Sequence, residues 1–104
     1  MKEEAMSYTD GKYGIVIFTQ TDEELPGKVI ITVGTTQNIL CAKAGNPYVK
    51  PCGRVLEGFH FFFSGTDGSL WTAQKVVDEK NAQAVFDELV EARRFGTLAL
   101  DVDC

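Results

Sequence analysis

Residues 78–96 read DEKNAQAVFDELVEARRFG, and this stretch decides the fold class. Its apolar side chains recur at spacings of three and four residues, which predicts an amphipathic helix over residues 79–95. Asp78 can cap the N-terminus of this helix, and Gly96 supplies the left-handed conformation that often follows a helix C-terminus. The apolar stripe of the helix consists of Ala82, Val85, Phe86, Leu89 and Ala92.

Two segments typical of β-strands flank this helix. Residues 70–77 precede it and residues 97–102 follow it, and both are rich in β-branched or large apolar side chains. Because a strand–helix–strand connection within one sheet is almost always right-handed and joins parallel strands, we expect these two strands to run parallel. In the last strand we expect Leu98, Leu100 and Val102 to face the core.

Three further strands are predicted before this unit. Residues 13–20 contain a contiguous apolar run from Ile15 to Phe18, so both faces of this strand need a cover. Residues 28–33 and 55–63 also have the composition of strands. Short turns connect the first strand to the second and the third to the fourth, which predicts two antiparallel hairpins.

Residues 35–44 admit two interpretations. Thr35 or Thr36 can cap a short helix that ends at Gly45, and the residue types in between favour this helix. The competing interpretation is an additional strand through residues 38–43.

The predicted fold class is α+β. We expect a mixed, mostly antiparallel five-stranded sheet with one or two helices packed on one face, in the order β-β-(α)-β-β-α-β. The chain has 104 residues, which suits one domain. We expect residues 12–104 to form this domain and residues 1–11 to be a flexible tail, because the tail is polar and has no periodicity.

Composition excludes several functional classes. Hydrophobic residues make up 44% of the chain and charged residues 24%, as in ordinary globular domains. The protein is acidic, with a formal net charge of −5, which argues against a nucleic-acid partner. No apolar run reaches the ~18 residues of a membrane helix, and the N-terminus does not resemble a secretory signal. We therefore expect no membrane association.

Cysteine usage predicts the compartment. The three cysteines cannot all pair within one chain, and they lack the C-x-x-C spacing of zinc and thioredoxin-type sites. We therefore expect no metal, no cofactor and a reducing, cytoplasmic location.

The charge layout suggests a site for an anion. Residues 25–56 contain four cations and no acid, and the second predicted strand ends where a helix could begin. Backbone N–H groups at a helix N-terminus bind anions, and nearby cations would add to this attraction. We expect an anionic small molecule or an acidic protein partner to contact Gly34, Thr35, Thr36, Asn38, Tyr48, Lys50 and Arg54.

An alternative site combines Cys52 with His60. Cys52 lies between Lys50 and Arg54, whose charges would lower its pKa, and a histidine can activate a thiolate nucleophile. His60 is the only histidine, and no orienting acid or amide is identifiable. A small enzyme with chemistry at Cys52 and His60 is therefore the alternative function.

Apolar side chains on the second face of the sheet suggest self-association. Phe59, Phe61 and Phe63 alternate along one strand and are expected to be core. The opposite face then carries Phe62 and His60, together with one side of the doubly apolar first strand. This sheet has more apolar surface than two helices can cover, so we expect a homodimer. The predicted interface residues are Val16, Phe18, His60 and Phe62.

These observations favour a small cytoplasmic homo-oligomeric binding or regulatory module over an enzyme. A third possibility is a subunit of a larger assembly, which would be poorly soluble when expressed alone.

Overall fold

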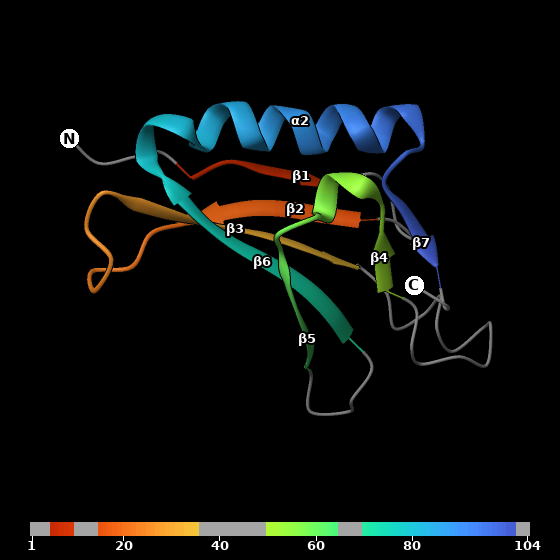
Figure 1. Ribbon diagram of the computed structural model, residues 1–104, viewed down its shortest axis with the longest axis horizontal. Coiled ribbons are helices and arrows are strands. Elements are labelled where there is room, and N and C mark those ends of the chain that lie inside the picture. Colours follow the sequence, from red (N-terminus) through yellow and green to blue (C-terminus); the bar gives the residue numbers. More distant parts are fainter. Residues whose placement is uncertain (1–4, 10–14, 36–49, 65–69, 102–104) are drawn as a thin grey trace.

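The computed structural model describes residues 5–9, 15–35, 50–64 and 70–101, and Figure 1 labels their elements. The main sheet is antiparallel throughout, with strand order β1-β2-β3-β6-β5. Its strands are β1 (Ser7–Thr9), β2 (Ile15–Gln20), β3 (Lys28–Thr35), β5 (His60–Ser64) and β6 (Leu70–Asp78). The remaining elements are β4 (Lys50–Cys52), η1 (Arg54–Leu56), η2 (Glu79–Asn81), α2 (Ala82–Phe95) and β7 (Ala99–Asp101).

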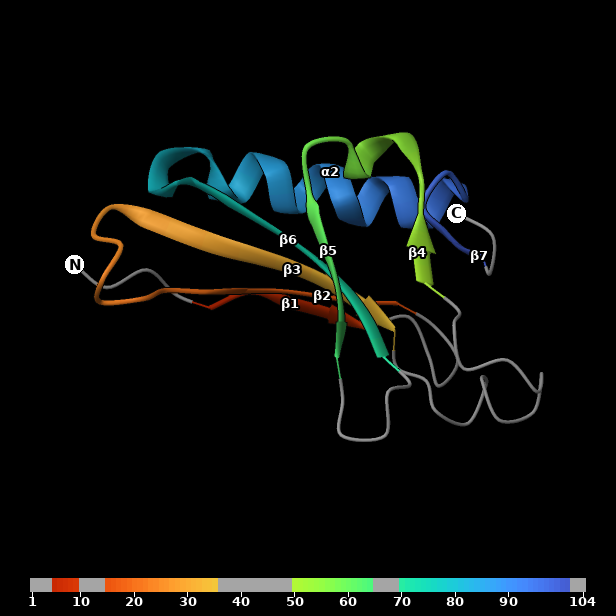
Figure 2. The same ribbon diagram turned by 60° about the horizontal axis from the view of Figure 1, so that its bottom comes forward.

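The helix α2 packs on one face of the sheet, as Figures 1 and 2 show. The predicted apolar stripe is confirmed, because Ala82, Phe86, Leu89 and Ala92 are buried. Gly96 ends the helix in the left-handed conformation, with φ of 82°. The prediction of an α+β fold with a helix on one face of the sheet is therefore correct.

The core lies between α2 and the sheet. Alternate residues of β2 and β3 point into it, and Phe59 and Leu56 close it at the side of β5. Leu98, in the turn after α2, is also fully buried, as predicted. The buried aliphatic side chains that the main sheet contributes to this core are Ile15, Ile17, Val29, Ile31, Val33 and Ala73.

The prediction that the last strand joins the main sheet in parallel is wrong. β7 instead pairs antiparallel with β4 in a separate two-stranded sheet at one end of the molecule. Both edges of β6 are already paired, with β3 and with β5, so no place beside β6 is open to the last strand. In the turn after α2, the N–H groups of Thr97 and Leu98 both bond to the carbonyl of Ala92. The Arg93 guanidinium donates to the Leu98 carbonyl at 2.9 Å and holds the same turn.

Two strand boundaries also differ from prediction. Residues 54–56 form η1, so β5 begins only at His60 and not at residue 55. Ser7–Thr9, expected within a flexible tail, pairs with β2 as β1. Two hydrogen bonds of Met6 hold the residue before β1 against β2. The Thr19 N–H donates to the Met6 carbonyl, and the Met6 N–H donates to the Thr19 hydroxyl at 2.9 Å.

Two expectations about single side chains fail as well. Asp78 precedes η2 but makes no capping bond with its carboxylate, which pairs with Lys28 on β3 instead. Phe61 is 38% exposed and is not core. The reason is its place on β5, at the edge of the sheet, whereas α2 lies over β2 and β3. The helix or strand expected within residues 35–44 lies outside the described residues beyond Thr35.

Candidate functional site: the outer face of the sheet

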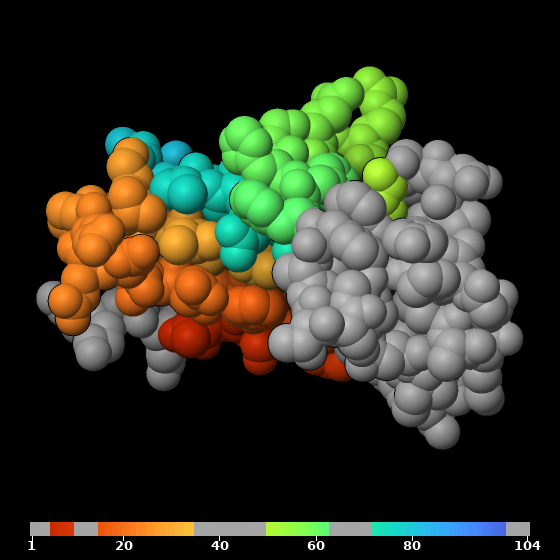
Figure 3. Space-filling view, turned by 90° about the horizontal axis from the view of Figure 1, so that it is seen from below, coloured from red at the N-terminus to blue at the C-terminus, as the bar shows by residue number. Residues whose placement is uncertain are grey.

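The sheet has a second face, which points away from α2 and which we call the outer face. Side chains alternate along each strand, and residues opposite each other in register share a face. In Figure 3, which views the molecule from the side away from α2, the strands of the main sheet reach the surface. The outer face comprises Ser7, Thr9, Val16, Phe18, Gln20, Ile30, Thr32, Gly34, His60, Phe62, Thr72, Gln74 and Val76.

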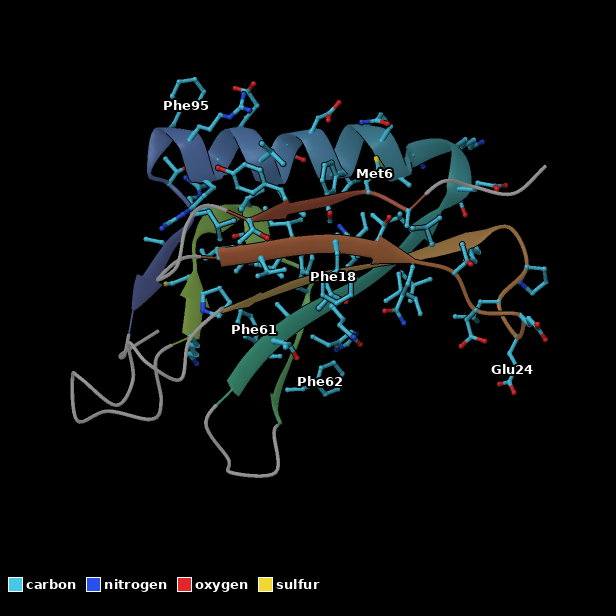
Figure 4. The ribbon with its side chains drawn as sticks, turned by 180° about the vertical axis from the view of Figure 1, so that it is seen from behind. Met6, Phe18, Glu24, Phe61, Phe62 and Phe95 are labelled. Atoms are coloured by element: carbon cyan, nitrogen blue, oxygen red, sulfur yellow. The ribbon has the colours of Figure 1, made fainter. Side chains whose placement is uncertain are left out.

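Large apolar side chains from four strands meet on this outer face. Val76 is 50% exposed and Phe62 is 47% exposed, while Val16, Phe18 and Ile30 are half-buried. Figure 4 shows Phe18 and Phe62 pointing away from α2. Among the elements that the structure describes, none packs over these side chains the way α2 covers the other face.

A polar pair lies near the middle of the outer face. The Gln74 amide donates to the Thr32 hydroxyl at 3.2 Å, from the neighbouring strand. Thr32 is almost fully buried, and its hydroxyl has this partner, so it does not carry the cost of an unpaired polar group. The outer face is therefore apolar on both sides of a satisfied polar centre.

None of the outer-face residues given above is an Asp, Glu, Lys or Arg, but the same alternation places Lys28 and Asp78, opposite each other in register, at the end of this face. The nearest charges form an ion pair at its border, where the Lys28 ammonium bonds to the Asp78 carboxylate. The hydrogen bond and the charge of Lys28 hold the pKa of Asp78 below its ordinary value. The described outer face therefore has no net charge, whereas the whole protein has a net charge of −5.

All four residues predicted to form an interface lie on the outer face. Val16 and Phe18 belong to β2, while His60 and Phe62 belong to β5. β3 and β6 separate the two pairs, so they lie roughly 14 Å apart across the sheet. The prediction missed Ile30 and Val76, which bridge this gap. Their positions in the alternating pattern of their strands were the available signal.

The structure brings together only part of the predicted anion site. β4, which begins at Lys50, packs against β3 and β6, so Lys50 lies near the strand that ends at Gly34 and Thr35. Arg54 is exposed on η1, a few residues further along. Thr36, Asn38 and Tyr48 lie outside the described residues.

Two lysines near β4 and β5 have their ammonium groups over aromatic rings. The Lys50 ammonium is 5.4 Å from the ring centroid of Phe61, and the Lys75 ammonium is 5.6 Å from that of Phe59. Such contacts hold a cation over the negative face of a ring. Sequence reasoning missed Lys75, whose only signal was its place on the α2 side of an alternating strand.

The Cys52 and His60 pair is not assembled as a thiolate site in this structure. Cys52 is disulfide-bonded, and a disulfide sulfur does not titrate. His60 is exposed on the outer face at the edge strand β5, whereas Cys52 belongs to the small β4–β7 sheet. Nucleophilic chemistry at Cys52 would first require reduction of its disulfide.

Within residues 5–9, 15–35, 50–64 and 70–101, no group of three or more His, Cys, Asp or Glu side chains is placed to hold a metal ion. Within the same residues, no helix is both long and apolar enough to cross a membrane. The chain matches no protein-family model, no curated protein and no solved structure.

Proposed function

We propose that this protein is a binding module that associates with a second copy of itself through the outer face. The observation that carries the proposal is the set of apolar side chains, drawn from four strands, that no described element covers. Exposed apolar patches of this kind mark interaction surfaces in globular proteins. A two-sided sheet normally buries both apolar faces, and a second copy is the commonest cover in soluble oligomers.

Charge favours a second copy as the partner. In a symmetric dimer the same surface of both copies comes together, so an acidic protein meets less repulsion when this surface carries no net negative charge. On the described outer face the acid, Asp78, is paired with Lys28, so this face carries no net charge. Five strands and three levels of side chains cover roughly 24 by 20 Å, which approaches the ~600–1,000 Å² that each partner buries in a specific interface.

Light scattering on size-exclusion peaks tests this proposal, at protein concentrations from about 1 to about 500 μM. We expect the wild-type protein to be a dimer at the upper end. Phe62→Asp places a charge on the outer face and should leave a folded monomer. Phe95→Asp is the matched control, because Phe95 is 77% exposed at the end of α2, away from the outer face (Figure 4). A wild-type monomer at every concentration contradicts the proposal.

A second candidate function is binding of an anion at the corner between β4, η1 and β5. Lys50 and Lys75 lie over the rings of Phe61 and Phe59, and Arg54 is exposed on η1 a few residues before them, which favours an anionic ligand. Inorganic phosphate titrated into labelled protein tests the candidate. Amide shifts that move together at Lys50 and Arg54 support it, and unchanged amides there contradict it.

The proposal of a cytoplasmic location came from three cysteines that cannot all pair within one chain and that lack C-x-x-C spacing. Disulfides are rare in the cytoplasm, so the state of Cys52 provides a test of this proposal. One disulfide uses two of the three cysteines and leaves one free thiol per chain. We expect thiol titration of the denatured protein to give one thiol without reductant and three after reduction. Three thiols in protein purified without reductant would instead favour the cytoplasm and would reopen Cys52 as a nucleophile.

A further inference from the structure

We infer that two copies pack outer face to outer face about a twofold axis that lies between β3 and β6 and runs along these strands. This inference rests on the proposed function, because it specifies how the second copy sits on the same surface. It is drawn from the pattern of side chains across the sheet register.

The register arranges the uncharged part of the outer face in three levels across the strands. The central level contains the polar pair, with an aromatic ring at each end. On one side of the central level lies a level rich in aliphatic side chains. On the other side lies a level that ends in Phe62. The central level is Phe18, Thr32, Gln74 and His60, the second is Gln20, Ile30 and Val76, and the third is Val16, Gly34, Thr72 and Phe62.

A twofold axis that lies in the contact plane along the strands keeps each level opposite itself. It exchanges the strands on the two sides of the axis, so β3 faces β6 of the second copy and β2 faces β5 of the second copy. Stacked sheets pack about 10 Å apart with their strands within about 30° of each other. This axis produces that aligned arrangement.

Under this axis, chemically similar side chains meet. Ile30 faces Val76 of the second copy, and each of these side chains otherwise presents apolar surface to water. Val16 faces Phe62 of the second copy in the same way. At the centre, the polar pair of one copy faces the polar pair of the other, and the ring of Phe18 faces the imidazole of His60.

An axis perpendicular to the strands gives a poorer match. It keeps each strand opposite itself and exchanges the second level with the third. Ile30 would then face Gly34, and Val76 would face Thr72 of the second copy. Both aliphatic side chains would meet a smaller or polar residue, which leaves a gap or an unpaired hydroxyl. The pattern therefore selects the axis along the strands.

Charged variants of facing residues test the register. Ile30→Asp and Val76→Lys should each weaken self-association about 100-fold or more, because each homodimer would bury two unpaired charges. When the two variants are mixed, the heterodimer has one Asp–Lys pair and one native Ile30–Val76 contact. We expect mixing to restore a dimer within about 10-fold of the wild-type dissociation constant. Circular dichroism verifies that each variant is folded.

A mismatched mixture is the control. Ile30→Asp with Val16→Lys places its charges opposite native Val76 and Phe62, so mixing these two variants should restore nothing. The pair Val16→Lys with Phe62→Asp provides a second matched mixture if Ile30→Asp does not fold. Single variants that dissociate without rescue in either matched mixture overturn the register and leave the proposed function standing. A wild-type monomer overturns both.

Discussion

Gly53 follows β4 and lies against the backbone of Thr97, so the absence of a side chain at this position lets the two segments approach closely. A Cβ atom built at this position would lie 2.3 Å from the Thr97 carbonyl oxygen, and both partners are backbone, so neither can rotate away. Gly53→Ala must therefore push β4 from the turn that precedes β7. We expect a loss of about 3 kcal/mol in the free energy of unfolding, measured by urea denaturation.

Gly27→Ala is the control for this substitution. Gly27 has φ of 78°, so alanine is strained there, but nothing lies within 4 Å of the added atom. The backbone strain alone should cost about 1 kcal/mol. If Gly53→Ala is no more destabilising than Gly27→Ala, the close approach of Gly53 to Thr97 does not constrain the fold.

The Lys28–Asp78 ion pair makes stability depend on acid pH. Lys28 lowers the pKa of Asp78 in the folded protein below the ordinary value of 3.8. A depressed carboxyl pKa contributes stability that is present above the unfolded-state value and is lost as the pH falls through the folded-state value. The stability difference between wild type and Asp78→Asn should therefore be present near neutral pH and shrink below about pH 3.8.

Urea denaturation of both proteins across this pH range measures the effect. Both side chains are 45% exposed, so solvent screens the pair and the difference should be small. Lys28→Gln supplies the control background, in which Asp78→Asn should change the pH dependence much less. A difference that is the same at acid and neutral pH would show that Asp78 acts through something other than its charge.

Sequence reasoning placed this residue correctly but gave it the wrong partner. Asp78 stands directly before the helical region, where a capping role is the natural local interpretation. Its actual partner, Lys28, is 50 residues away and is brought beside it by the β3–β6 register. The disulfide of Cys52 was missed for a similar reason, because the pairing of a cysteine in a disulfide depends on the tertiary structure.

At the scale of elements, α2 was the most predictable part because its period is visible within its own sequence. Leu89 is fully buried in the centre of its apolar face. Leu89→Ala should cost about 2–5 kcal/mol of unfolding free energy, through lost burial and the cavity left against β2 and β3. Thermal or urea denaturation measures this loss.

Glu88 is the matched position, one residue earlier on the exposed side of the same helix. Glu88→Ala keeps helix propensity high and removes no buried contact, so its effect should stay within about 0.5 kcal/mol. Comparable losses at the two positions would mean that α2 does not pack through the face described.

Short strands were less predictable than the helix for a physical reason. β1, β4 and β7 have three residues each, too few to show a period, and their pairing is set by segments far away in the chain. The strand–helix–strand rule predicted a parallel pair because it assumes one sheet. In the folded sheet β3 and β5 already pair with the two edges of β6, and the last strand pairs with β4 instead.

At the scale of the whole molecule, the outer face was predictable in outline. The contiguous apolar run of β2 showed that this strand needs cover on both faces, and Val16 and Phe18 followed from it. The role of β3 and β6 at the centre was not predictable, because strand order is a property of the complete sheet. For that reason Ile30 and Val76 could be assigned to the centre of the outer face only once the β3–β6 register was known.

Salt should strengthen self-association if the outer face is the contact. Two copies with a net charge of −5 repel each other, while on their facing surfaces the charges of Lys28 and Asp78 cancel within each copy. At about 0.1 M salt the screening length is about 10 Å, so added salt removes much of this repulsion and leaves the apolar contact intact. The dissociation constant from sedimentation equilibrium should therefore fall between about 20 and about 300 mM salt. A contact built on ion pairs, such as one between Lys50, Arg54 and Lys75 and the exposed acids Asp87, Glu88 and Glu91 of α2, weakens over the same range. A rising dissociation constant would therefore move the interface away from the outer face.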